Sequence, residues 1–422
     1  MVRGVSPIRT RESLAILLPF LIYSITVWVY ASRQPLLDDY SVVLAFLSEY
    51  FVQKNSLDGV AAVSGVGSNP SGSRLALILS LHNEHRLVFP RWVILADHQI
   101  FGRVDIAHLI YFGNLGWLGC FGIFFIHARR LAMSDRQILT ISLVMASLFH
   151  WEIMTWATGA LQQYWQLFFS LLSFRCMASR AVSGAALFYI LATITGGGGL
   201  LVGPVLVLVS VLARRCRDAL LMLVLTAAMA YVYLVLLGYQ RPPHHPDIIE
   251  SLFQPARLIM YFFAFFGAGL HFKWIALTAG LVVASVAVVY VTDVLKRDRV
   301  QENFFEVSVV ALIFLTAVVG ALTRSGLGVE QAASSRYSIY GVTLAVAVYM
   351  GWVRERVELF SGPVIRYGLI TALLTFIAVF PVAIWKLAEC QQRLESGQIV
   401  YPDPAAARER LNLARPYIRL QD

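Results

Sequence analysis

Five consecutive polar or ionisable residues at 82–86 interrupt an otherwise apolar part of the sequence. Among them, Glu84 and His85 are candidates for proton transfer, because carboxylate and imidazole groups act as general acids and bases. Arg86 and the nearby Arg91 are candidates for phosphate recognition, because a guanidinium group can donate two parallel hydrogen bonds to phosphate oxygens. The alternative is a salt-bridge cluster that holds a loop against the rest of the protein. The stretch predicts either one wall of an active site or such a structural cluster.

His82 and His85 are both candidate substrate-binding residues, and they are three residues apart. On one helix this spacing would also let the two imidazoles bind a single metal ion. No third ligand is evident, and the four cysteines are scattered without a metal-binding motif. The sequence therefore predicts no metal site, and it leaves the cofactor unknown, with a divalent metal as an open alternative.

A pair of carboxylates, Asp38 and Asp39, directly follows the first long apolar run. Either could accept a proton from an acceptor hydroxyl as a general base. Alternatively, one of them caps the N-terminus of a helix over 38–51, where apolar residues recur at helical spacing. Such a helix would lie in the membrane interface. One aspartate could cap while the other acts chemically.

Other polar residues stand at the ends of apolar runs, and we predict that they bind substrate. They are Asp97, Glu152, Gln163, Arg324 and Arg336. Ionisable groups near hydrocarbon often mark function, and the two arginines could clamp a phosphate. The alternatives are an interfacial polar belt for Glu152 and Gln163, and snorkelling side chains for the arginines.

Two motifs carry weaker signals. Gly196–Gly199 predicts a tight turn, with a phosphate-binding nest as the alternative, although no phosphate-loop motif follows it. His244 and His245 predict a solvated loop, with a position over a cavity as the alternative.

The composition is that of a multi-pass membrane protein. Of the 422 residues, 58% are hydrophobic and only 14% are charged, against about 25% charged in soluble domains. The net charge of +9 does not indicate a nucleic-acid partner, because the basic residues fall in short loops between apolar runs. The expected partner of the surface is the lipid bilayer, and the expected location is the bacterial inner membrane.

Apolar runs predict eleven spans: 12–31, 106–126, 137–157, 160–174, 181–195, 200–213, 219–238, 274–295, 304–323, 337–353 and 364–385. The short run 258–270 either crosses or is re-entrant. Its length and the distribution of basic residues favour a segment that does not cross. With this count, the chain forms a single transmembrane domain over 1–422, with a polar C-terminal tail, 386–422, on the outer side.

The long first loop, 32–105, is predicted to lie on the periplasmic side with two interfacial helices, and its length indicates a function. Its second amphipathic stretch is predicted over 74–101, with a break at Pro90. If this stretch is helical, His82 and Arg86 share one face. Between the two helices, 64–73 has the composition of a flexible loop.

This layout resembles the membrane glycosyltransferases of the C-type fold (GT-C). The shared features are a first span that runs outward, an acidic residue directly after it, a long outer loop and many later spans with short inner turns. The motifs His82-Asn83-Glu84-His85-Arg86, Phe89-Pro90-Arg91 and Ser335-Arg336-Tyr337 also resemble segments of bacterial membrane proteins related to that class. The resemblance implies an all-α polytopic bundle of about 11–12 transmembrane helices.

The resemblance also implies a reaction. A sugar would move with inversion from a polyprenyl-phosphate donor to a glycan or lipid acceptor on the periplasmic face. By position, Asp38 or Asp39 matches the catalytic base, with Glu84 as a further candidate, while Arg324 and Arg336 would hold the departing phosphate. The chain lacks a WWDYG-like motif and a separate soluble domain, so donor and acceptor stay open.

Three other functions compete with this one. A polysaccharide polymerase or ligase would use similar substrates, but a ligase is expected to carry its large outer loop late in the chain. A transporter predicts internal repeats and charges at mid-membrane, which the sequence does not show. A membrane O-acyltransferase would need a histidine constellation within its spans.

Overall fold

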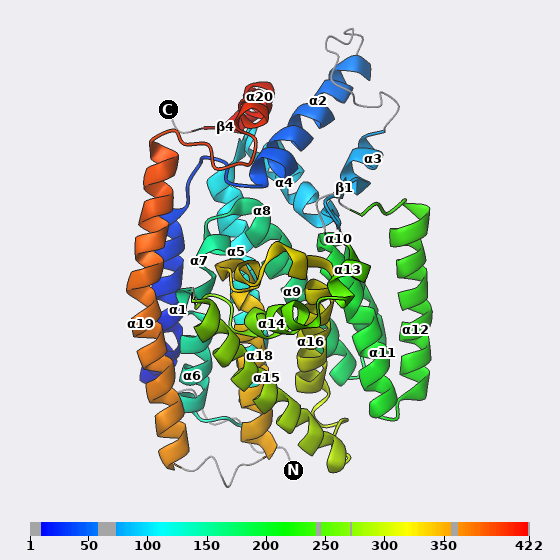
Figure 1. Cartoon of the computed structure of the whole chain (residues 1–422), viewed down its shortest axis with the longest axis vertical. Helices are drawn as coiled ribbons and strands as arrows, with labels where there is room; N and C mark the ends of the chain where they lie inside the picture. The colour runs from blue at the N-terminus through cyan, green and yellow to red at the C-terminus, as the bar shows by residue number, and fades with distance from the viewer. Residues whose placement is uncertain (1–9, 58–72, 242–245, 271, 356–361, 421–422) are drawn as a thin grey trace. The chain divides into compact units, whose positions relative to one another are not determined.

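The computed structural model describes residues 10–57, 73–241, 246–270, 272–355 and 362–420. Over these residues the chain is almost entirely helical, with two short two-stranded sheets (Figure 1). This confirms the predicted all-α class. His244, His245 and most of the predicted flexible loop (64–72) lie outside the described residues.

One compact unit comprises residues 1–29, 118–151 and 248–387. Its elements are α1 (Thr10–Tyr30), the second half of α5 (Ile106–Arg130), α6 (Asp135–Met145), η2 (Leu148–His150), α13 (Ile248–Leu252), α14 (Pro255–Phe266), α15 (Lys273–Lys296), α16 (Phe304–Arg324), η6 (Ser325–Leu327), α17 (Val329–Ala332), η7 (Ser335–Tyr337), α18 (Ser338–Glu355) and most of α19 (Gly362–Glu395). We refer to it as the 248–387 unit.

The other compact unit comprises residues 30–117, 152–247 and 388–422. Its elements are η1 (Tyr40–Ala45), α2 (Phe46–Leu57), α3 (Arg74–Leu79), β1 (Leu81–His82), β2 (His85–Arg86), α4 (Val88–Phe101), β3 (Val104–Asp105), the first half of α5, α7 (Trp151–Met154), α8 (Ala157–Gly159), η3 (Ala160–Tyr164), α9 (Trp165–Ala178), α10 (Val182–Thr195), η4 (Gly197–Leu201), α11 (Val202–Leu212), α12 (Cys216–Ala230), η5 (Tyr231–Leu236), α20 (Pro404–Ala414) and β4 (Ile418–Arg419). We refer to it as the first-loop unit.

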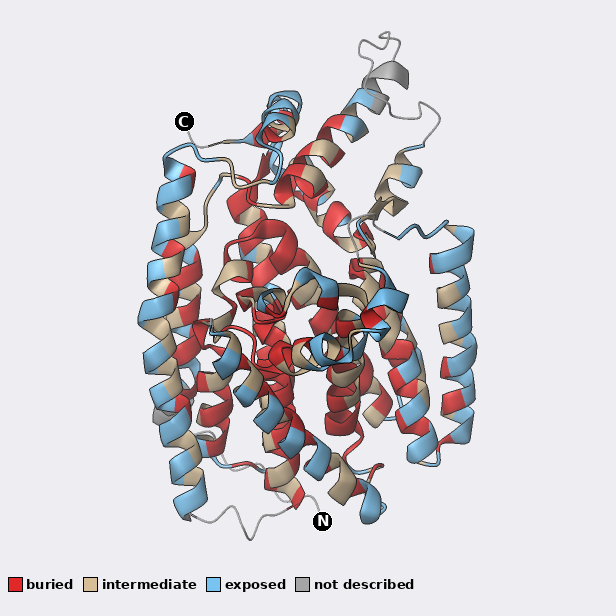
Figure 2. Cartoon of the chain, viewed as in Figure 1, coloured by how far each residue is buried: buried red, intermediate tan, exposed pale blue. Residues whose placement is uncertain are grey.

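Six helices among the described residues are long and apolar enough to cross a bilayer, so the chain is a multi-pass membrane protein. They are Ile106–Arg130, Asp135–Met154, Cys216–Leu236, Lys273–Lys296, Phe304–Leu327 and Pro363–Glu395. The eleven predicted spans exceed this number because several of them are short helices. Five shorter apolar helices are Leu14–Tyr30, Tyr40–Val52, Val182–Thr195, Gly197–Leu212 and Pro255–Phe266. Figure 2 shows α12 with many exposed residues, as expected of a lipid-facing helix.

The first loop contains the helix predicted from Asp38 onward, as η1 and α2. The helical prediction over 82–86 is wrong, because β1 and β2 form an antiparallel hairpin there. Asn83 adopts a left-handed conformation with φ of 51° at the turn, which a helix does not allow. Pro90 does not break the second helix, since it occupies the first turn of α4, where a missing N–H is tolerated. The break falls earlier, at the hairpin.

The C-terminal tail packs on the first loop. β4 pairs in parallel with β3, and α20 lies against η1 (Figure 1). Backbone hydrogen bonds join Leu37 N to Val400 O at 3.0 Å and Val104 N to Tyr417 O at 2.8 Å. Loop and tail therefore pack together within the first-loop unit although they lie far apart in the sequence.

In the 248–387 unit, α14 and α15 form a tight helical hairpin. A Cβ at Gly280 would lie 1.8 Å from the carbonyl oxygen of Phe263, so only glycine allows this approach. The 12 residues of α14 span roughly 18 Å at 1.5 Å per residue, short of the roughly 30 Å of bilayer hydrocarbon. This length favours the alternative in which the segment does not cross, and that alternative stays a prediction.

Candidate active site

The two neighbouring carboxylates of the first loop have different environments. Asp39 is fully buried, and its side chain accepts hydrogen bonds from Thr158 N at 2.8 Å, Thr158 Oγ1 at 2.6 Å and Leu36 N at 3.1 Å. Burial raises the pKa of Asp39 to about 6, against the opposing effect of these donors. Asp39 thus ties the chain before η1 to the start of α8, and its oxygens point at backbone and hydroxyl donors rather than at solvent.

Asp38, in contrast, is partly exposed to solvent. Its side chain is 39% exposed, and its Oδ2 lies 3.6 Å from Nε2 of His82. The capping alternative is not observed for Asp39, which stands at the N-cap of η1 without a side-chain capping bond. Of the two aspartates, Asp38 has the accessibility that a base for an external hydroxyl requires.

The β1–β2 hairpin brings together the two histidines of the polar stretch. His82 and His85 are direct cross-strand partners, so both side chains lie on one face of the hairpin. His85 Nε2 lies 3.5 Å from Oε1 of Glu84, and His82 pairs with Asp38. The exposed fractions of these four side chains range from 16% to 39%. The hairpin therefore presents two carboxylate–imidazole pairs in a partly hydrated setting, which suits proton transfer.

Two contacts fix the hairpin against the helices behind it. The backbone N–H of Gly197 donates to Nδ1 of His85 at 3.1 Å, which leaves Nε2 of that ring to face Glu84. The Tyr233 hydroxyl accepts from Arg86 N at 2.9 Å and donates to Glu84 O at 3.0 Å. A Cβ at residue 197 would lie 2.9 Å from Glu84 O. The glycine run thus forms the predicted tight turn, and it lets the hairpin approach closely.

Arg86 and Arg91 donate to backbone carbonyls. Arg86 donates to Leu79 O and Leu237 O, both at 2.6 Å, and is only 4% exposed. Arg91 donates to Ile78 O and Ser80 O, at 2.9 Å and 2.7 Å. Both side chains satisfy carbonyls in the last turn of α3 or directly after α3 and η5, which is a structural role. We therefore do not include them in the proposed chemistry.

The remaining candidates of this unit are dispersed. Asp97 is buried, accepts from Asp105 N at 2.9 Å and lies 3.0 Å from Nδ1 of His108, so it holds the turn before α5. Glu152 is half-buried in α7. Gln163 is half-buried in η3, and its Oε1 is buried without a hydrogen-bond partner among the described residues. The hairpin does not gather these three, and their predicted substrate contacts stay predictions.

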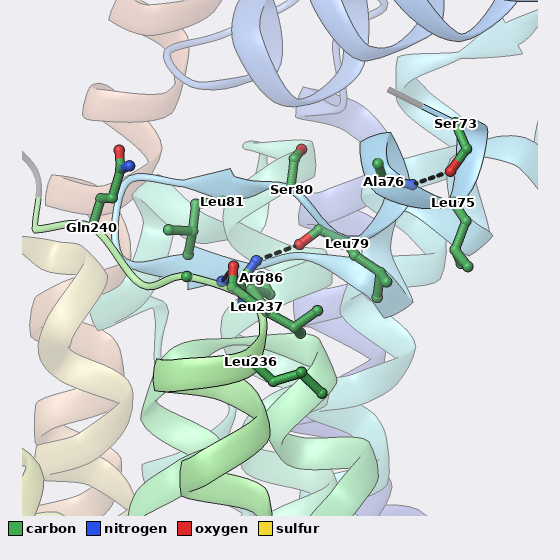
Figure 3. A pocket seen from close by; sticks show the side chains of 11 residues that line it. Ser73, Leu75, Ala76, Leu79, Ser80, Leu81, Arg86, Leu236, Leu237 and Gln240 are labelled. Carbon is green, nitrogen blue, oxygen red and sulfur yellow. Dashed lines mark hydrogen bonds between the residues drawn. The ribbon is translucent and has the colours of Figure 1, made fainter. Parts of the chain in front are cut away.

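An apolar groove of about 570 Å³ opens beside the hairpin (Figure 3). Its walls come from α3, the hairpin and the end of η5 with the residues after it. They are Ser73, Leu75, Ala76, Leu79, Ser80, Leu81, Arg86, Leu236, Leu237, Gly238 and Gln240. Side chains alternate along a strand, so Leu81 and Arg86 face the groove while His82 and His85 lie on the opposite face. The hairpin therefore presents Leu81 and Arg86 to the groove and the two histidines to the opposite side.

Arg324 and Arg336 belong to the 248–387 unit. Arg324 ends α16 and hydrogen-bonds the Tyr337 hydroxyl, and the guanidinium of Arg336 lies 5.5 Å from the centre of the Tyr337 ring. The hydroxyl of Ser335, which directly precedes Arg336, donates to Phe149 O at 2.7 Å. The loop is thus well supported, and phosphate binding by its arginines stays a prediction.

Over the described residues, no group of three or more histidine, cysteine or acidic side chains could hold a metal ion. Sequence reasoning missed Thr158, Tyr233 and Gly197 as supports of the site. Gly197 stood in a noted glycine run, but its partner was not foreseeable. Thr158 and Tyr233 carry no local signal, because their partners are 119 and 147 residues away. Neither family models, nor curated proteins, nor solved structures give a match to this chain.

Proposed function

We propose that this protein is a membrane glycosyltransferase that uses a polyprenyl-phosphate-linked sugar and that Asp38 is its general base. The observation that carries the proposal is the Asp38–His82 pair, a solvent-accessible carboxylate 3.6 Å from an imidazole. A transferase of this kind needs a base that an acceptor hydroxyl can reach. Asp39 next to it is occupied by three donors and serves as its support.

The proposed step is a single displacement with inversion. The acceptor hydroxyl gives its proton to the Asp38 carboxylate while its oxygen forms a bond to the anomeric carbon of the donor sugar. The bond between that carbon and the phosphate oxygen breaks, and its electron pair leaves with the phosphate. His82 orients the carboxylate through their contact and can take up the proton afterwards. The Glu84–His85 pair on the same face is the second candidate for sugar contacts.

The apolar groove supports a lipid-linked substrate. Its leucines line a surface that continues onto η5, where Val235 and Leu236 are 63% and 66% exposed. An exposed apolar surface at the end of a membrane helix is favourable only when lipid covers it. A polyprenyl chain could therefore lie in the groove at the apolar face of the hairpin.

The topology that we propose has eleven crossings, and α14 is the short segment that does not cross the membrane. Contacts within the first-loop unit join five segments, which we therefore assign to one side of the membrane: loop 1, Thr158, Gly197, Leu237 and the tail after 388. The chain from 238 to 388 must then cross an even number of times. Its apolar helices are α14, α15, α16, α18 and α19, so one of the five does not cross, and α14 is the shortest.

This side is the periplasmic one in our proposal. Arg129 and Arg130 end α5. Arg214 and Arg215 lie between α11 and α12, and Arg217 lies in the first turn of α12, at the opposite ends of these helices. Basic residues favour the cytoplasmic side. The candidate base would then face the periplasm from the inner membrane.

Donor consumption tests the function directly. Purified protein in lipid vesicles would be incubated with a panel of radiolabelled polyprenyl-phosphate and polyprenyl-diphosphate sugars, together with glycan and lipid extracts as acceptors. We expect release of the free polyprenyl phosphate from one donor, and a raised KM for that donor in Leu79→Glu, which places a charge in the groove. If no donor is consumed while labelled sugar crosses the vesicle membrane intact, a transporter replaces the transferase.

A further inference from the structure

The backbone before the proposed base is strained. Leu37 has φ of 51°, in the left-handed region that a leucine rarely adopts. Such a conformation costs roughly 1–3 kcal/mol and persists only where the surroundings hold it. Around Leu37, the donors to Asp39 fix the following turn, and the Leu37 N–H itself donates to Val400 O in the C-terminal tail at 3.0 Å.

The tail also packs against side chains on both sides of Asp38. Leu36 forms a buried cluster with Trp156 and Leu394, against which Val400 packs. The ring of Tyr401 lies 5.4 Å from that of Tyr40. Tail residues therefore contact the segment that carries Asp38 on both sides of this residue, at Leu36 and at Tyr40.

Further contacts stabilise the position of the tail, so this position does not depend on the contacts around Asp38 alone. Arg410 of α20 hydrogen-bonds the Tyr401 hydroxyl and stacks over its ring at 5.2 Å. The side chain of Asp403 caps α20 by accepting from Ala405 N and Ala406 N. At the other end of the tail, the Tyr417 ring stacks on that of Phe51 in α2 at 4.7 Å. The tail thus contacts both η1 and α2.

We infer that the C-terminal tail, residues 394–419, is a positioning element of the active site that holds the strained Leu37 turn and thereby places the Asp38 carboxylate. The inference rests on the proposed function of Asp38. Tyr401 is its chief positioning residue: it touches Tyr40 and Arg410 and adjoins the Val400 carbonyl. A displacement of a reacting group by about 1 Å can reduce a rate by about 100-fold.

Two measurements on the full-length protein in vesicles test this inference. The first is hydrogen exchange of peptides covering residues 30–45, which report the Leu37 amide. The second is the steady-state kinetics of sugar transfer. The variants are Tyr401→Ala, Tyr401→Phe, which keeps the ring, and the control Asn412→Ala, which changes an exposed residue of α20. Asp403→Ala, which removes the cap of α20, is a second disruptive variant should Tyr401→Ala not fold.

We expect Tyr401→Ala to speed exchange in 30–45 by about 10-fold and to lower kcat by about 10–100-fold with KM within about twofold. Tyr401→Phe should recover most of both, and Asn412→Ala should match wild type. Faster exchange with unchanged kcat, or unchanged exchange, overturns the positioning role. If wild-type protein transfers no sugar although exchange responds as expected, the proposed function fails, and the catalytic role of the tail fails with it.

Discussion

Replacing Thr158 by valine isolates the support of the candidate site. Valine has nearly the shape of threonine, so the change removes one hydrogen bond, from Oγ1 to the buried Asp39 carboxylate at 2.6 Å. A hydrogen bond to a charged group contributes about 1.5–3 kcal/mol, and one to a neutral group about 0.5–1.5 kcal/mol. The loss therefore depends on whether Asp39 is ionised.

The pH dependence follows from the pKa of Asp39. Burial raises it from 3.8 to about 6, a difference equivalent to roughly 3 kcal/mol. Because the folded pKa lies above the unfolded one, stability is greatest at low pH and declines between about pH 4 and about pH 6. The Thr158 side chain opposes this rise, so Thr158→Val raises the pKa of Asp39 further. The variant should lose about 2 kcal/mol near pH 8 and about 1 kcal/mol near pH 4.5.

Thermal unfolding in detergent micelles measures this loss at both pH values. A change of 1 kcal/mol moves the midpoint by about 2–4 °C in a domain of 150–250 residues. The matched control is Thr195→Val, which removes a hydroxyl that donates only to Leu191 O in its own helix. Its effect should be small and independent of pH. An equal destabilisation by Thr158→Val at both pH values would refute the interpretation of Asp39 as a buried carboxyl group that ionises in this pH range and accepts a hydrogen bond from Thr158.

Further predictions concern the hairpin, its arginine and the topology. Gly197→Ala should lower the rate of sugar transfer at least about 10-fold, because the added Cβ would lie 2.9 Å from Glu84 O. The control is Gly368→Ala, whose Cβ would meet no atom within 4 Å. This control should leave the rate unchanged. Arg86→Lys should reduce the free energy of unfolding by about 2–4 kcal/mol, since one ammonium cannot reach both the Leu79 and the Leu237 carbonyls. A fully stable variant would contradict the structural role of Arg86. Reporter fusions after Leu270 and Gly397 should both report the periplasm. A cytoplasmic signal at either position would contradict the proposal that α14 does not cross the membrane.

The sequence was sufficient where local chemistry decides the structure. Among the described residues, apolar runs predicted the six helices that are long enough to cross a bilayer, and the spacing from Asp38 to Phe51 predicted η1 and α2. The tight turn at Gly196–Gly199 followed from composition. The position of Asp38 after the first apolar run also identified the accessible carboxylate, although it could not separate this residue from its neighbour.

The remaining features depend on distant contacts. Burial of Asp39 requires Thr158, 119 residues away, so no local pattern distinguishes the supporting aspartate from the accessible one. The hairpin at 81–86 was predicted as helix because its strands have only two residues each, too few for an alternating pattern. Arg86 and Arg91 looked like phosphate ligands because their carbonyl partners become visible only when the helices are placed.

The rate of sugar transfer by Asp38→Asn tests the central claim most directly. Asn keeps the size of the side chain and removes its basicity together with the charge that faces His82. An ion pair with a 39% exposed partner contributes little to stability, so the folded state should be nearly unaffected. We predict a loss of kcat of about 100-fold or more with an unchanged unfolding midpoint. Asp38→Asn protein that transfers sugar at the wild-type rate would contradict the assignment of Asp38 as the base.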